Sequence, residues 1–132
     1  MSDQTPFEKL GGASQVRAIC QKFYQVMQTL PEAKNILEMH PKNLQSSEEK
    51  LYLFLSGWLG GPRLYEEKYG HPRLRARHLP FSIGKDERNM WILCMVHAFD
   101  ELKIPEPIRS EVLHPLLNLA NHMRNREEDE SE

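Results

Sequence analysis

One histidine, His78, stands in a setting that suits a metal ligand. It ends a short helical pattern in which Leu74, four residues earlier, falls on the same face, and Pro80 follows it directly after Leu79. The surrounding segment, 60–81, is rich in glycine and proline and carries several arginines. A neutral imidazole can bind a metal through one ring nitrogen while the other donates a hydrogen bond to a carbonyl. Taken alone, however, His78 is better explained as a buried, hydrogen-bonded residue.

The other five histidines carry weaker signals. His40 and His71 each precede a proline, which favours a turn in the first case and the start of a short helix in the second. His97, His114 and His122 fall within helical patterns, where solvated or capping positions explain them. The chain contains no HExxH, no CxxC and no glycine-rich phosphate loop. A Ser-His-Asp catalytic set cannot be assigned from spacing, because such groups meet only in three dimensions.

Two aromatic residues and a group of cations change the interpretation of His78. Tyr24 and Trp91 lie on the apolar stripes of two predicted helices, where their polar ends need partners when buried. Core aromatics bonded to carbonyls, and a solvated basic face, would explain these features separately. Together they describe an apolar slot with one imidazole ligand, donors on its far side and cations at its mouth, and an anionic haem fits such a slot best. The cations are Arg63, Lys68, Arg73, Arg75 and Arg77.

Helical spacing recurs along the chain and no segment alternates convincingly with a period of two, so we predict an all-α fold. The connector at 61–71 is long for a compact domain, which is typical of functional loops. A turn is expected at Met39-His40-Pro41. The predicted helices cover residues 14–30, 31–37, 46–59, a short stretch from 71 to 78, 85–102 and 108–123.

Local signals set the expected ends of these helices. Ser14 is the predicted N-cap of the first, and Ser46 or Ser47 that of the helix carrying Trp58. Pro115 lies inside the last helical pattern and should kink or break it.

Length and charge bound the class of protein. At 132 residues the chain is long enough for one domain with a real core. Five of the 19 acidic residues lie at 127–132, so the remainder has 17 basic and 14 acidic residues, too mild a balance to indicate nucleic-acid binding. We therefore predict one domain at 1–126 followed by a disordered acidic tail at 127–132.

Cysteine content and hydropathy indicate the compartment. Cys20 and Cys94 lie far apart within apolar helical patterns, so we interpret both as buried thiols rather than as a disulfide or a zinc site. The longest apolar run, 91–96, is far too short to span a bilayer, and the first residues carry no signal-sequence pattern. A cytoplasmic location without membrane insertion is expected.

At this point the motifs resemble those of a known family, the truncated haemoglobins, and specifically its group II. The resemblance extends from Phe7 to about Met123, and the order and spacing of the motifs make it specific. The matching motifs are Phe23-Tyr24, Phe54-Leu55, Gly60-Gly61-Pro62, Tyr65, Gly70-His71-Pro72-Arg73-Leu74-Arg75, Arg77-His78, Pro80-Phe81, Glu87-Arg88 and Trp91.

The resemblance implies a two-over-two helical sandwich enclosing haem b. It assigns His78 as the proximal iron ligand and Tyr24 and Trp91 as distal hydrogen-bond donors. It places Arg77, Tyr65 and Lys50 at the propionates. The haem-contacting apolar residues would be Leu51, Phe54, Phe81 and Ile83.

Two positions depart from the family pattern. The distal turn position, which often holds phenylalanine or tyrosine, is His40 here, and the distal histidine position of larger globins aligns with Ser47. Stabilisation of a bound ligand would thus fall to Tyr24, Trp91 and His40. His40 is also a candidate sixth iron ligand. A hydrogen bond from His40 to a distal water or to Tyr24 is the alternative.

The resemblance implies binding of dioxygen, nitric oxide and carbon monoxide, in gas binding, transfer or sensing. An enzymatic alternative is nitric oxide dioxygenation or peroxidase turnover, and an unidentified reductase is a candidate partner. A non-haem all-α interaction domain is the third interpretation, and it leaves His78 and the buried donors unexplained.

Overall fold

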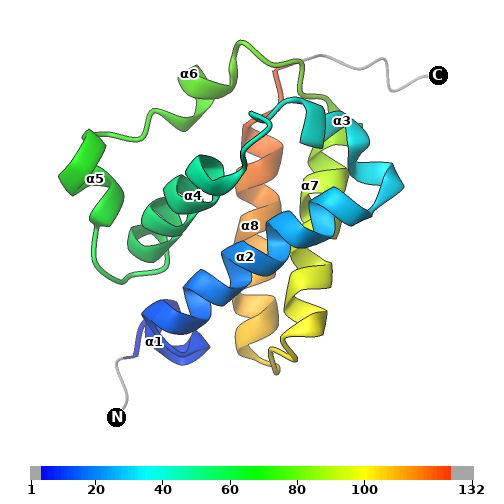
Figure 1. The fold of residues 1–132 in the computed structure, drawn as a ribbon. Helices are drawn as coiled ribbons and strands as arrows, with labels where there is room; N and C mark the ends of the chain where they lie inside the picture. Colours follow the sequence, from blue (N-terminus) through cyan, green and yellow to red (C-terminus); the bar gives the residue numbers. More distant parts are fainter. Residues whose placement is uncertain (1–3, 126–132) are drawn as a thin grey trace.

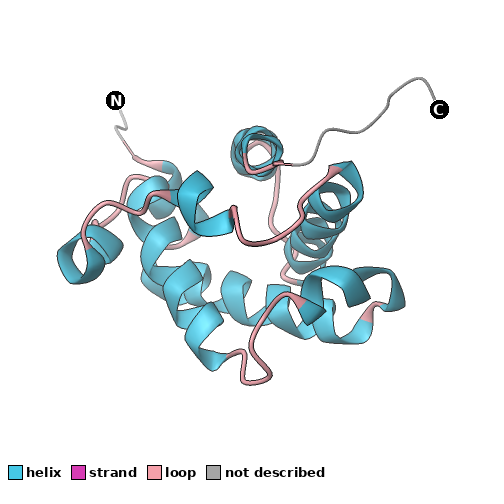
Figure 2. Cartoon of the chain, turned by 90° about the horizontal axis from the view of Figure 1, so that it is seen from above, coloured by secondary structure: helices cyan, strands magenta, loops and turns pink. Residues whose placement is uncertain are grey.

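The structure, a computed structural model, describes residues 4–125, and every regular element in this range is a helix (Figure 2). The prediction of an all-α fold is confirmed. The predicted acidic tail at 127–132 lies outside the described residues.

Four long helices form the body of the molecule. They are α2 (Ala13–Thr29), α4 (Gln45–Trp58), α7 (Lys85–Glu101) and α8 (Ile108–His122). Helix α2 contacts both α4 and α7, and α7 also packs against α8. Figure 1 shows α2 crossing in front of α7 and α8, with α4 beside it. One pair of helices therefore lies over the other, and the predicted two-over-two arrangement is confirmed.

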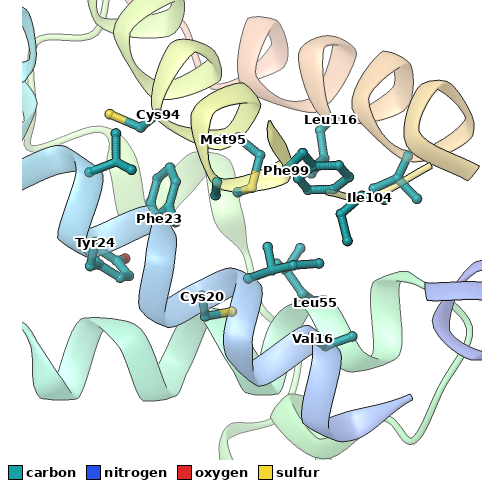
Figure 3. Close-up of a cluster of buried hydrophobic side chains, with 14 of the residues drawn as sticks. Val16, Cys20, Phe23, Tyr24, Leu55, Cys94, Met95, Phe99, Ile104 and Leu116 are labelled. Atoms are coloured by element: carbon teal, nitrogen blue, oxygen red, sulfur yellow. The ribbon is translucent and has the colours of Figure 1, made fainter. Parts of the chain in front are cut away.

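The core lies where these helices cross. Phe23 of α2, Met95 and Phe99 of α7 and Leu116 of α8 are at most 1% exposed (Figure 3). Each buried side chain of this size stabilises the fold by about 1.5–3 kcal/mol relative to an exposed one. The core thus fixes α7 relative to α2, and with them the positions of Trp91 and Tyr24.

A short helix, α1 (Pro6–Leu10), precedes the first predicted one. Its capping box is complete, because Thr5 Oγ1 accepts from the Glu8 N–H at 3.2 Å and Glu8 Oε1 accepts from the Thr5 N–H at 3.0 Å. Phe7 of this helix lies against Gly61, where an added Cβ would stand 2.6 Å from the ring. Because Gly61 has no side chain, α1 can pack against the end of α4.

Both predicted serine caps are wrong. Helix α2 is capped by Gly12, whose φ of 80° ends the preceding turn, and Ser14 lies inside the helix. Helix α4 begins at Gln45, because the Asn43 carboxamide oxygen accepts from the Gln45 N–H at 2.9 Å. Residues 46–47 consequently belong to its first turn.

The segment after α2 follows the prediction closely. Pro31 opens the 3-10 turn η1 (Pro31–Ala33), which leads into α3 (Lys34–Glu38). The expected turn follows, with the His40 N–H donating to the Leu37 carbonyl at 3.0 Å.

The segment between α4 and α7 is more helical than predicted. Helix α5 (Leu64–Tyr69) interrupts the expected connector at 61–71. Helix α6 (Leu74–His78) begins later than the predicted start at 71, because Arg73 has a left-handed backbone with φ of 48°. The result is two short helices that project beside α4 in Figure 1.

The last helix is not broken at Pro115. Helix α8 runs through it without interruption from Ile108 to His122. Pro115 and its partner one turn earlier, Glu111, are both exposed, so water can satisfy the carbonyl that loses its donor.

Candidate functional site

His78 ends α6 with its ring already oriented. Its Nδ1 lies 2.6 Å from the Leu74 carbonyl oxygen, and the residue is half-buried. A carbonyl only accepts, so Nδ1 carries the proton and Nε2 presents a lone pair. This is the tautomer that a metal-binding imidazole requires.

Polar contacts hold the start of α6. The Arg77 Nε–H donates to the Pro72 carbonyl at 2.8 Å, and the Arg73 N–H donates to His71 Nδ1 at 3.0 Å. His71 is exposed and serves the turn before α6, so its position agrees with the predicted structural role.

The end of α8 reaches the loop that follows His78, a connection that sequence patterns did not predict. The Asn125 side-chain amide donates to the His78 and Phe81 carbonyls at 3.0 and 2.8 Å. Arg75 Nη1 donates to the His122 and Arg124 carbonyls at 2.8 and 2.7 Å. These contacts join residues 44 to 49 positions apart, and no local pattern could reveal them.

Tyr24 is buried, with its ring among other aromatic rings. The centroid distances are 4.9 Å to Phe23 and 5.6 Å to His40, both in edge-on arrangements. Its hydroxyl reaches the Ser47 carbonyl only at 3.5 Å, too long for a strong bond. Burial raises the pKa of the Tyr24 phenol, and nearby Cys20 and Glu48 raise it further, so the phenol stays a donor at neutral pH.

Trp91 joins the same aromatic cluster from α7. Its ring centroid lies 5.1 Å from that of Phe23. Phe23 thus contacts both predicted donors, and the structure brings Tyr24 and Trp91 to one place although 67 positions separate them in the chain. Trp91 is only partly buried, so its ring is not fully enclosed by the chain itself.

His40 lies beside Tyr24 with its own ring anchored. Its Nδ1 is 2.7 Å from the Ile36 carbonyl oxygen, which again leaves Nε2 as the lone-pair nitrogen. Burial lowers the pKa of His40, the hydrogen bond to Ile36 opposes this, and an electrostatic interaction with His78 lowers it further.

The apolar residues predicted to contact haem differ in burial. Ile83 is buried, whereas Leu51 and Phe54 are partly buried and pack on the rim of the core. Phe81 and its neighbour Leu79 are 39% and 57% exposed. The chain thus leaves apolar side chains uncovered next to His78, as a site for a large apolar ligand would.

Both cations predicted to face the propionates lie near tyrosine rings. The Arg77 guanidinium lies 6.0 Å from the centroid of the buried Tyr65 ring, and Lys50 Nζ lies 5.8 Å from that of Tyr69. The two tyrosine rings are 5.0 Å apart, so Tyr69, which we did not predict, lies close to both Tyr65 and Lys50.

Two members of the predicted cation group have other partners. Arg63 pairs with Glu66 at 3.2 Å, and Arg75 binds the carbonyls at the end of α8. Arg63 and Arg75 are thus already engaged in contacts within the chain, and the gathering of the five cations at one mouth stays a prediction.

The thiols are both free and buried, which confirms their interpretation as small core residues. Burial raises the pKa of Cys20 to about 12 and that of Cys94 to about 11, so neither forms a thiolate at neutral pH.

Within the described range, no three His, Cys, Asp or Glu residues gather so that they could hold a metal ion. None of the described helices is both long enough and apolar enough to cross a bilayer.

Comparison with known proteins places this geometry in a family. The family model described as bacterial-like globin matches residues 5–125. The group 2 truncated hemoglobin YjbI of Bacillus subtilis is 36% identical over 98% of this chain and 95% of its own length.

Solved structures agree with the sequence relatives. The group II 2-on-2 hemoglobin of Agrobacterium tumefaciens is 44% identical, with a TM-score of 0.89 over 96% of this chain and 98% of that one. The cold-adapted truncated hemoglobin of Pseudoalteromonas haloplanktis is 42% identical, with a TM-score of 0.89 over 94% of this chain and all of that one. This chain therefore belongs to the bacterial-like globin family, as a group II truncated haemoglobin.

Proposed function

We propose that the chain binds haem b with His78 as the proximal ligand and takes up dioxygen, nitric oxide or carbon monoxide beneath Tyr24 and Trp91. The observation that carries the proposal is the His78 ring itself, bonded through Nδ1 to the Leu74 carbonyl at 2.6 Å so that Nε2 can coordinate. Family membership supports haem-based ligand binding in general.

The residues present fit such a cofactor. A lone imidazole, with no cluster of metal ligands in the described part of the chain, suits a metal that arrives within its own macrocycle. The uncovered side chains of Leu79 and Phe81 would receive its apolar surface, together with Leu51, Phe54 and Ile83. Arg77 and Lys50, with Tyr65, would meet the propionate charges. When bound, haem supplies an iron that coordinates diatomic gases.

The distal donors determine how long a ligand stays. The Tyr24 hydroxyl is held only by a 3.5 Å contact with the Ser47 carbonyl, so it can turn toward a ligand at little energetic cost. The Trp91 indole N–H would be the second donor. A strongly polarised hydrogen bond contributes about 1.5–3 kcal/mol, roughly one to two decades in dissociation rate. Slow dioxygen release suits a sensor, scavenger or reaction site better than a carrier.

Oxidation of nitric oxide to nitrate by dioxygen is the second candidate function; peroxidase turnover, in which peroxide is reduced by electrons from a reducing substrate, is a separate enzymatic alternative. The observation that favours it is the pair of donors around Phe23, which would retain dioxygen long enough to react. Each nitrate formed from one nitric oxide and one dioxygen requires one electron, so this function needs a reductase. The need for a reductase and the cytoplasmic location stay predictions.

An absorbance spectrum of the purified protein tests the haem proposal. A Soret band that scales with protein concentration supports it, and a protein that takes up no haem on reconstitution contradicts it. Stopped-flow mixing of the dioxygen form with nitric oxide, and of the ferric form with peroxide, then separates simple binding from the enzymatic candidates.

His40 makes a further spectral prediction. If its Nε2 coordinates, the ferric protein is low-spin, and His40→Ala converts it to the high-spin form. The 2.7 Å bond from His40 to the Ile36 carbonyl orients the ring without using Nε2, which is why coordination is chemically open to it. Ferric protein that is high-spin before the substitution would instead assign His40 to hydrogen bonding with a distal water or Tyr24.

A further inference from the structure

We propose that Asn125, just beyond α8, is a positioning residue that fixes the proximal histidine. The inference rests on the proposed function, because it concerns the positioning of His78, which that function assigns as the iron ligand. It adds a residue that neither the motifs nor the family resemblance assigned to the site.

Asn125 makes four hydrogen bonds to the loop after α6. Its side-chain amide donates to the His78 and Phe81 carbonyls at 3.0 and 2.8 Å. Its side-chain oxygen accepts from the Ile83 N–H at 3.0 Å. Its backbone N–H donates to the Ile83 carbonyl at 2.9 Å. Asn125 is thus hydrogen-bonded to both ends of the loop from His78 to Ile83.

Arg75 adds a second connection from α6 to the same place. Its Nη1 donates to the carbonyls of His122 and Arg124, which are at the end of α8 where carbonyls lack helical partners. These charge-assisted bonds hold the front of α6 while Asn125 holds its rear.

Helix α6 needs such external support. It has only five residues, and none of them is buried. A helix of this length is not stable by itself, and Leu79 and Pro80 after it are exposed. The position of His78 relative to the core therefore depends on polar links, and Asn125 provides the link that ends on the His78 carbonyl itself.

Substitutions can distinguish the roles of the two polar groups of the Asn125 carboxamide, its NH2 donor and its oxygen acceptor. Asn125→Ala removes both, whereas Asn125→Asp keeps the acceptor for Ile83 and replaces the donor by an oxygen facing the His78 and Phe81 carbonyls. Asn121→Ala is the matched control, because the Asn121 side chain accepts from Arg88 Nη1 of α7 at 2.7 Å rather than from a group of α6.

Two readouts test the proposal on the haem-loaded protein. The first is the rate of haem transfer to an excess of a high-affinity acceptor protein. Removing outer-shell partners of a ligand typically weakens a metal site by roughly 10–100-fold, so we expect Asn125→Ala and Asn125→Asp to release haem about tenfold faster or more. The second is the iron–histidine stretching band of the ferrous, ligand-free form in resonance Raman spectra, which we expect to shift or broaden in both variants.

Asn121→Ala should leave the haem-transfer rate and the Raman band as in the unaltered protein. The proposal is overturned if both Asn125 variants release haem within twofold of the unaltered protein with an unchanged iron–histidine band. It is also overturned if Asn125→Asp matches the unaltered protein while only Asn125→Ala differs, because the donor to His78 would then be dispensable. Failure of the unaltered protein to bind haem is a separate result, and it overturns the proposed function together with this inference.

Discussion

Replacing His78 by glycine should abolish stable haem binding, and adding free imidazole should restore it. The substitution removes the only Nε2 that the Leu74 carbonyl prepares for coordination, and it leaves a space at the end of α6 that imidazole can fill. The measurement is the Soret absorbance per protein after reconstitution, with and without imidazole. The expected loss is large, because the proposed attachment has a single protein–metal bond.

His71→Gly is the matched control for this experiment. His71 lies seven residues earlier, is exposed, and accepts a hydrogen bond from the Arg73 N–H in the turn before α6. It should retain full haem content. A His78→Gly protein with the unaltered haem content and spectrum would remove His78 as the ligand.

Removing the distal donors should accelerate dioxygen release. Tyr24→Phe deletes only the hydroxyl and preserves the ring contacts with Phe23 and His40. Trp91→Phe deletes the indole N–H. Each change should raise the dissociation rate constant by about ten- to a hundredfold, because each removes one polarised hydrogen bond of about 1.5–3 kcal/mol. Stopped-flow displacement of dioxygen by carbon monoxide measures this rate.

The double variant and a control sharpen the test. Both donors pack on Phe23, so their effects should couple, and the double variant should differ from the product of the single effects. Trp58→Phe is the control, since it removes an indole from the other end of the fold, where α4 ends. A single variant that releases dioxygen at the unaltered rate shows that its donor does not stabilise the ligand.

The long helices were predictable because each carries an apolar stripe of several turns. Helices α1 and α5, of five and six residues, were not predicted, whereas α3 and α6, equally short, were predicted from Pro31 and from the Leu74–His78 spacing. The signal for α1 was nevertheless present, since Thr5 and Glu8 form a capping box with Pro6 between them. The caps of α2 and α4 failed for a different reason. Gly12 and Asn43 lie just before the predicted serines. Gly12 is the N-cap of α2, and Asn43 accepts from the N–H of the first residue of α4, so both helices begin earlier than predicted.

Some residues of the candidate site could likewise be predicted from the sequence, and others could not. Tyr24, Trp91 and His78 could be predicted because a characteristic order of motifs carries them, and the structure places Tyr24 and Trp91 on one aromatic cluster with His40. Asn125 could not be found, because its partners are 42 to 47 positions away and its own neighbourhood shows only the end of a helix. Such contacts are defined by the tertiary packing of α8.

The link from Asn125 to the loop after His78 has a consequence for the order of events in the cell. A nascent chain grows from its N-terminus, and the α2, α4 and α7 segments exist before the residues that fasten α6 have been made. Helix α6, which carries His78, can be fixed in place by Asn125 only once synthesis has passed residue 125. We therefore expect a ribosome-bound chain halted before that residue to lack the capacity to retain haem, so that cofactor loading is a late, post-translational step.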